Sequence, residues 1–152
     1  MTTPISFPST TPAFALPLLF AGQAQKEFFL NQAFSVVDAY LSGSLEASLA
    51  QPPVAPAEGA LYRVLPEASG DWAGQDDALA AYIAGDWVFS RPQDGMRMFD
   101  RQLGASITFD GGWKAATPPP VPTGGTTIDT EARASIAAIV SVLREAGILP
   151  QS

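Results

Sequence analysis

The chain has 152 residues, a length that suits one compact domain with appendages. Its net charge of −7, with only eight Lys and Arg residues, argues against nucleic-acid binding, because that affinity rests on basic side chains. Histidine and cysteine are both absent, which excludes Ser-His-Asp and Cys-His catalysis, disulfides and thiolate metal sites. We therefore expect a protein that is not an enzyme and that has neither metal nor cofactor.

The first residues predict an extended arm. Residues 1–12 contain three prolines and many Ser and Thr, which disfavour a helix. Such an arm either docks onto a neighbouring chain or has no role. The apolar run Ala13–Ala21 is shorter than the roughly 20 residues that cross a bilayer, and Pro17 interrupts it, so we expect no membrane insertion. Residues 1–12 also lack the Lys or Arg of a signal peptide.

An amphipathic helix is predicted over residues 24–41. Its apolar side chains recur three and four residues apart, as on one helix face: Phe28, Phe29, Ala33, Val36, Val37, Tyr40 and Leu41. Gly43 and Ser44 allow the chain to leave this helix. Residues 45–49 then alternate between apolar and polar, which fits either a short strand or a continuation of the helix.

The middle of the chain predicts a small antiparallel meander. A strand at Ala60–Leu65 comes first, followed by a turn at Ser69–Trp72. Short runs separated by glycine-containing turns then follow at Leu79–Ala84, Trp87–Ser90, Met96–Asp100, Ala105–Phe109 and Trp113–Ala115, with the first turn at Gly85-Asp86.

The last part predicts a linker and a second helix. Residues 117–127 are rich in proline and then glycine, and a helix follows in which Asp129 or Thr130 is the cap and Gly147 the end. The expected fold class is α+β. Its parts are the arm at 1–12, an α+β domain at 13–116, the linker at 117–127 and the C-terminal amphipathic helix at 128–149.

The C-terminal helix has an apolar stripe that needs a partner surface. Its residues recur at four-three-four-three spacing and are Ala132, Ile136, Ile139, Leu143 and Ala146, with Val140 widening the stripe. Barely two heptads are too short for an independent coiled coil. The stripe therefore either joins chains, with Ile136, Ile139, Val140 and Leu143 as the oligomerisation residues, or packs on its own domain.

Aromatic residues near turns suggest a ligand surface. Trp72, Trp87 and Trp113 each follow a turn, and Tyr82 lies in a strand nearby. Such rings can stack on the apolar faces of sugars, although a Trp in a small sheet is more often part of the core. The nearby acids are Asp71, Asp76, Asp77 and Asp86, and they lack the spacing of a calcium loop, which favours capping and turn roles.

A resemblance lies in the stretch from Leu16 to Asp38. Leu-Pro-Leu-Leu at 16–19, Ala-Gly-Gln-Ala-Gln-Lys-Glu at 21–27 and Asn31 resemble the opening of a domain family of phage-derived particles. That family includes prophage tail fibres and the spikes or fibres of gene transfer agents. The resemblance extends through the Gly-Asp-Trp segments and to the C-terminal helix.

The resemblance implies a structural virion component, a head spike, a tail fibre or its base, that supports host attachment. Its implied partners are copies of itself, as a trimer or pentamer, and another particle protein such as a capsid, spike or fibre protein. It would be made in the cytoplasm and released by lysis inside a virion-like particle, which requires no signal peptide. The alternative is a carbohydrate-binding module that recognises capsular or other surface polysaccharide. A carboxylate-dependent glycan hydrolase is the least favoured hypothesis.

Overall fold

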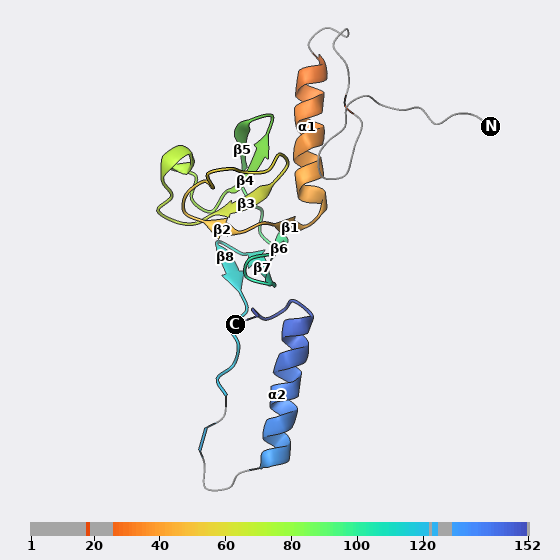
Figure 1. Ribbon diagram of the computed structural model, residues 1–152, viewed down its shortest axis with the longest axis vertical. Helices are drawn as coiled ribbons and strands as arrows, with labels where there is room; N and C mark the ends of the chain where they lie inside the picture. The colour runs from red at the N-terminus through yellow and green to blue at the C-terminus, as the bar shows by residue number, and fades with distance from the viewer. Residues whose placement is uncertain (1–17, 19–25, 122, 125–128, 152) are drawn as a thin grey trace, which may run out of the picture. The chain divides into compact units, whose positions relative to one another are not determined.

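The computed structural model describes residues 18, 26–121, 123–124 and 129–151. The predicted arm at 1–12 lies outside the described residues, as do most of the apolar run and parts of the linker. The chain divides into two compact units, Met1–Arg91 and Pro92–Ser152. Each unit combines a helix with β-strands (Figure 1), so the predicted α+β class is confirmed.

The first unit begins with helix α1 at Lys26–Leu41, which confirms the predicted helix and packs against strand β4. The face that it buries differs from the predicted one. Asp38 and Ala39 are buried, whereas the predicted inward residues Val37 and Leu41 are more than half exposed. The exposed stripe is spaced four-three-four and consists of Leu30, Phe34, Val37 and Leu41.

Two short strands follow α1. Gly43 has a φ of +62°, a conformation that suits glycine and ends the helix. The ambiguous segment then forms β1 at Ser44–Leu45 and β2 at Ser48–Leu49, which excludes a continuation of the helix. The central Leu45 and Ala47 are buried and Glu46 is exposed, as the alternating sequence requires.

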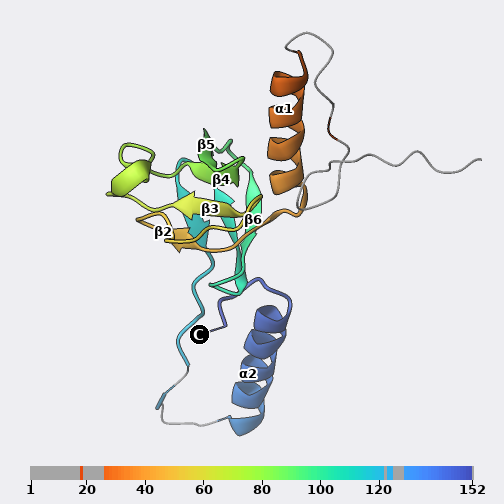
Figure 2. The ribbon, with the colours of Figure 1, turned by 45° about the horizontal axis from the view of Figure 1, so that its top comes forward.

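The sheet of the first unit has the strand order β2-β3-β4-β5. Strand β3 spans Leu61–Val64, β4 spans Leu79–Ile83 and β5 spans Asp86–Ser90. The β3–β4 and β4–β5 pairs are antiparallel, whereas β2 pairs with β3 in parallel. Figure 2 shows these strands beside α1. The predicted meander is therefore confirmed here, with an added parallel strand.

The β4–β5 turn lies one residue earlier than predicted. Ile83 pairs with Asp86, so the two turn residues are Ala84 and Gly85, with φ values of +54° and +86°. Positive φ at both central residues is the pattern of a type I′ hairpin turn, which matches the twist of the strands it joins. Asp86 thus belongs to β5, although its Gly-Asp sequence suggested a turn.

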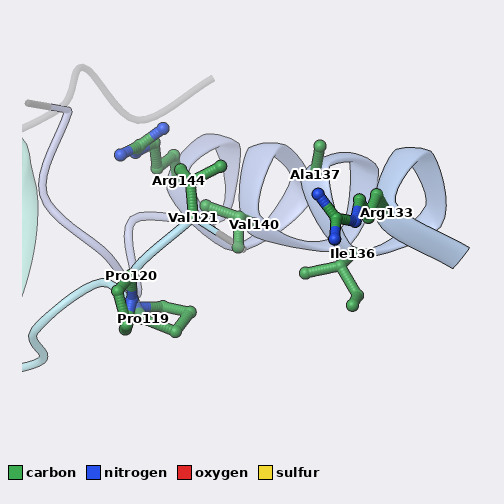
Figure 3. A pocket seen from close by; sticks show the side chains of 8 residues that line it. All are labelled: Pro119, Pro120, Val121, Arg133, Ile136, Ala137, Val140 and Arg144. Carbon is green, nitrogen blue, oxygen red and sulfur yellow. The ribbon is translucent and has the colours of Figure 1, made fainter. Parts of the chain in front are cut away.

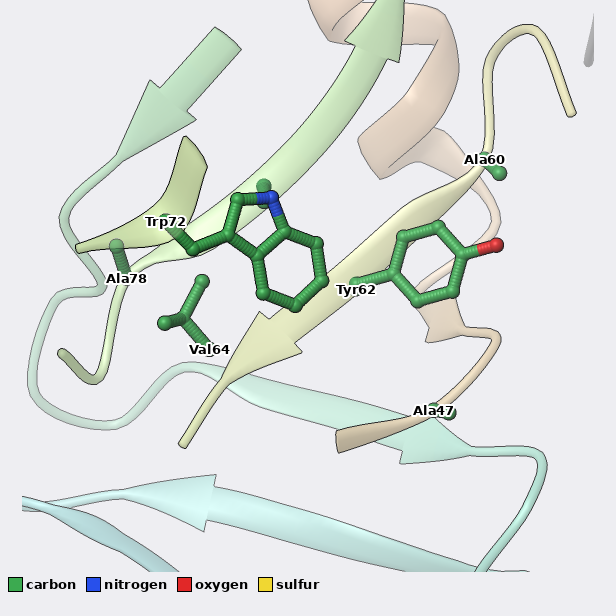
Figure 4. Close-up of a cluster of buried hydrophobic side chains, with 7 residues drawn as sticks. Ala47, Ala60, Tyr62, Val64, Trp72 and Ala78 are labelled. Carbon is green, nitrogen blue, oxygen red and sulfur yellow. The ribbon is translucent and has the colours of Figure 1, made fainter. Parts of the chain in front are cut away.

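The core of the first unit is aromatic. Trp72 ends the 3₁₀ turn η1 at Gly70–Trp72 and is fully buried. It packs with Tyr62 and Val64 of β3 and with small residues around them (Figure 4). Asp77 has a φ of +61° and lies in a turn, which agrees with the predicted turn role of this acid.

The second unit contains the remaining strands and helix. Strands β6 at Arg97–Asp100, β7 at Ala105–Phe109 and β8 at Trp113–Ala115 follow one another in an antiparallel meander. Met98 faces Ile107 across the ladder, and both are buried. Helix α2 spans Thr130–Glu145, inside the predicted range of 128–149.

Candidate functional site

The candidate site lies on helix α2, whose two ends are defined by local chemistry. The Asp129 carboxylate accepts a hydrogen bond of 2.9 Å from the backbone N–H of Ala132, so Asp129 is the cap. At the other end Gly147 has a φ of +66°. The N–H groups of Gly147 and Ile148 donate to the carbonyls of Arg144 and Leu143. This pair of bonds is a Schellman motif, which ends a helix at a glycine.

The segment after α2 anchors the helix to the strands of its own unit. The Ser106 N–H donates to the Gly147 carbonyl at 2.8 Å, and Leu149 is buried. A Cβ added to Gly147 would lie 2.8 Å from the Phe99 ring, so this approach requires glycine. The anchor is therefore the tail at residues 147–151.

The body of α2, in contrast, has no buried residue among its 16, all of which the structure describes. Its largest apolar side chains are exposed by 43% at Ile136, 59% at Ile139 and 60% at Val142. Burying one such side chain contributes about 1.5–3 kcal/mol, so the helix holds a large unused driving force for association. Of the predicted stripe, Ile136 and Ile139 are thus exposed, whereas Val140 and Leu143 are half-buried.

A groove runs along one side of α2. It is a cavity of about 270 Å³ that separates the helix from the proline-rich segment. Figure 3 shows its lining, which consists of Pro119, Pro120, Val121, Arg133, Ile136, Ala137, Val140 and Arg144. An apolar cavity of roughly 150 Å³ can hold a benzene molecule, so this groove has room for aliphatic side chains.

The four predicted oligomerisation residues do not form one uniform stripe. Ile136 and Val140 line the groove, whereas Ile139 does not. Ile139 and Val142 form an exposed ridge beside the groove, about 60° apart on the helix. Leu143 is half-buried, and its carbonyl receives two bonds from the tail. Sequence periodicity missed Val142, which its spacing of three from Ile139 could have indicated.

The predicted aromatic ligand residues separate into two places. Trp72 and Trp87 meet edge to face with ring centroids 5.0 Å apart, and Tyr82 lies 5.0 Å from Trp87. Tyr62 contacts both tryptophans. Burial raises the pKa of Tyr62, and the Glu46 carboxylate raises it further. These rings form a core cluster, with Trp72 out of reach of solvent.

Trp113 lies in the second unit and is half-buried, as Trp87 and Tyr82 are in the first unit. Its ring meets Phe109 at 5.4 Å in an edge-to-face pair. The pair flanks the exposed turn between β7 and β8, where Lys114 and Asp110 form an ion pair of 2.6 Å. This ion pair lowers the pKa of the Asp110 carboxyl. Trp87 and Trp113 thus each combine an aromatic partner with a position beside an exposed turn, whereas Trp72 does not.

Residues 30–114 match the family described as Protein of unknown function (DUF2793). The chain belongs to the DUF2793 family. The DUF2793 match runs from α1 into β8, so it contains the aromatic cluster and Trp113 but not α2 or its groove. No curated protein matches the chain. Most of the Leu16–Asp38 stretch precedes the DUF2793 match.

The acidic residues of this DUF2793 chain serve local structure. Asp76 accepts a bond of 3.1 Å from the Ala68 N–H, and Asp77 pairs with Arg63 at 3.5 Å. No three acidic side chains gather as a metal site would need in the part of the chain that the structure describes. Within the same residues, neither helix has the length and apolarity that crossing a bilayer requires.

Proposed function

We propose that this chain is a structural component of a phage-like particle, a gene transfer agent or a prophage. In it, the chain forms a homo-oligomeric head spike or fibre, or the base of one, and supports attachment to the host-cell surface. The observation that carries the proposal is the exposed apolar ridge and groove of α2. The resemblance of the Leu16–Asp38 stretch supplies the particle context.

Helix α2 supports an assembly role because the side chains of Ile136, Ile139 and Val142 stay largely exposed in the described chain. Soluble monomers rarely expose contiguous apolar patches of this kind, and such patches mark interaction sites. Helix α1 adds a second exposed stripe, which includes Phe34 and Leu41. A particle presents many copies of each component, so self-association through such surfaces suits a spike or fibre.

A cell that produces such particles provides the test. In it, the gene is replaced by an Ile139→Asp/Val142→Asp variant, in which two carboxylates stand on the ridge. We expect particles that lack the chain and adsorb to host cells less than wild-type particles do. The matched control is Val54→Asp, because Val54 is a fully exposed apolar residue of the first unit. A ridge variant incorporated at the wild-type level, or particles that adsorb normally without the chain, would contradict the proposal.

A second candidate function is glycan binding, which the half-buried Trp113 beside Phe109 favours. A ring at an exposed turn can stack on a sugar face. Titration of capsular polysaccharide should then quench tryptophan fluorescence, and Trp113→Ala should abolish the quench. The same titration of Trp72→Phe is the control, because Trp72 is fully buried. An unchanged quench in Trp113→Ala would reject this candidate.

A further inference from the structure

Helix α2 carries opposite charges on the two edges of its apolar face. Successive residues turn by about 100°, which places Arg133 and Arg144 on one edge within roughly 20° of each other. Glu131 and Glu145 fall within roughly 40° of each other on the opposite edge. The ridge of Ile139 and Val142 lies between the two edges. A single helix thus has a basic side and an acidic side.

The groove lies on the basic side only. Both arginines line it together with Ile136 and Val140, and the proline-rich segment closes its far wall. The Arg133 guanidinium donates to the Gly124 carbonyl, and the Arg144 Nε donates to the Pro150 carbonyl at 3.2 Å. These bonds tether both arginine side chains to backbone of their own unit, beside the apolar floor of the groove.

The ridge matches this groove in shape and in charge. It is convex and aliphatic, and the groove is concave with an aliphatic floor. The acidic edge flanks the ridge as the basic edge flanks the groove. The surface that binds and the surface that is bound therefore differ, which makes the contact heterologous. Heterologous contacts form a ring where the rotation between neighbours closes, and an open filament where it does not.

We infer that copies of this chain associate as a parallel ring, in which the Ile139–Val142 ridge of one α2 enters the groove beside α2 of the next copy. With neighbouring helices in register, Arg144 lies within about 1.5 Å of the axial level of Glu145 of the next copy. Arg133 lies within about 3 Å of the level of its Glu131. The inference rests on the proposed self-association and names its geometry.

An antiparallel pair of helices does not satisfy these charges. A two-fold axis between antiparallel helices places each edge beside the same edge of its partner, so that Arg133 faces Arg144 and Glu131 faces Glu145. Like charges at close approach are destabilising. The charges therefore select the parallel arrangement, which every cyclic ring around an axis along the helices preserves.

Charge exchange on the full-length chain tests the ring. The acidic-edge variant is Glu131→Arg/Glu145→Arg, and the basic-edge variant is Arg133→Glu/Arg144→Glu. Each alone should associate at least about tenfold more weakly than wild type at low salt, with a smaller difference at about 0.5 M salt. A mixture of the two variants should associate more strongly than either variant alone, because each contact between unlike variants pairs opposite charges. A ring with an odd number of copies keeps one contact between like variants, so restoration there is partial.

The matched control is Asp71→Arg/Asp86→Arg, which changes the net charge as much as the acidic-edge variant does. Both replaced residues are exposed and lie in the first unit. Circular dichroism verifies that each variant is folded. The basic-edge variant could fail to fold because Arg144 holds the tail. In that case the ring is tested with the acidic-edge variant only, measured first by itself and then in a mixture with wild type.

The outcomes separate the two claims. A wild-type chain that stays monomeric at every concentration overturns the self-association on which the ring rests. A wild-type oligomer that neither variant weakens leaves self-association standing and overturns the ring. Three results together support the ring. The acidic-edge variant associates more weakly than wild type, the control associates as strongly as wild type, and addition of the basic-edge variant restores association of the acidic-edge variant.

Spin labels then report the direction of the helices. The chain has no cysteine, so single labels at Thr130→Cys or Ser141→Cys are specific. A parallel ring gives similar neighbour distances at both positions. An antiparallel pair gives distances that differ by roughly 10 Å, because residue 130 lies farther from the centre of the helix than residue 141 does. The second result would overturn the parallel arrangement.

Discussion

The aromatic cluster of the first unit and helix α2 of the second use apolar residues in opposite ways. Trp72 is fully buried and packs against two other rings, those of Tyr62 and Trp87. Ile139 and Val142 are about 60% exposed on a helix in which no residue is fully buried. The cluster therefore contributes to the stability of one chain, whereas α2 exposes apolar surface that we propose is buried in a contact between chains.

The clearest way to break this comparison is to remove one large side chain from each region. Trp72→Ala should lower the free energy of unfolding by about 3–5 kcal/mol, because it leaves a cavity in the core. Ile139→Ala should change the unfolding of the isolated chain by less than about 0.5 kcal/mol and should weaken association instead. Urea unfolding at low protein concentration measures both. Equal losses of stability would remove the distinction between the two regions.

The tail at residues 147–151 sharpens the comparison, because it is the packed end of an otherwise exposed helix. Gly147→Ala should destabilise the second unit by about 1–3 kcal/mol, since φ is positive and the new methyl meets the Phe99 ring. In a chain that already carries Phe99→Ala, Gly147→Ala should destabilise less, because the clash with the ring is gone and only the strain of the positive φ remains. Hydrogen exchange of the Ser106 amide measures the effect, and unchanged protection would show that the tail is not the anchor.

A stabilising change is expected in the first unit. Ala84 has a positive φ in an exposed turn, so Ala84→Gly should raise the free energy of unfolding by about 0.5–1 kcal/mol. Ala84→Val at the same position should lower it, because a branched side chain resists that conformation. Paired thermal unfolding curves compare the two. A glycine variant less stable than wild type would argue against the type I′ turn.

The smallest expected effect concerns the pH dependence of the aromatic cluster. Burial and Glu46 hold the pKa of Tyr62 above its usual value in the folded state, so the folded chain loses the hydroxyl proton at a higher pH than the unfolded chain does. The contribution of this raised pKa to the free energy of unfolding is therefore constant below about pH 10 and decreases at higher pH. Tyr62→Phe should flatten that decrease in urea unfolding between pH 8 and 11. An identical slope in the variant would reject this cause.

The helices and strands were predicted correctly from the sequence wherever apolar periodicity and turn residues agreed. Helix α1 and most strands lie within two residues of prediction, because glycines such as Gly43 and Gly111 mark their ends. The buried face of α1 was not predicted, since packing buries Asp38 and Ala39 and leaves the more apolar Val37 and Leu41 exposed. Which apolar face is buried depends on the partner surface, and that surface comes from distant residues.

The candidate site was predictable only in part. The apolar spacing of α2 identified Ile136 and Ile139, but it could not separate the ridge from the groove. That separation depends on where Pro119 and Pro120 lie beside the helix. The three tryptophans looked equivalent in the sequence. Burial distinguishes Trp72 from Trp113, because η1 delivers Trp72 into the core while Trp113 opens β8 beside a turn.

The most direct test of the central claim is the molar mass of the full-length chain in solution by light scattering. Removal of α2 by truncation would also remove the tail that anchors the second unit, so the point variant Ile139→Asp/Val142→Asp is preferable, with Val54→Asp as its control. We predict a defined oligomer for wild type and for the control, and a folded monomer for the ridge variant. A monomeric wild type, or a ridge variant that keeps the wild-type mass, would contradict the account.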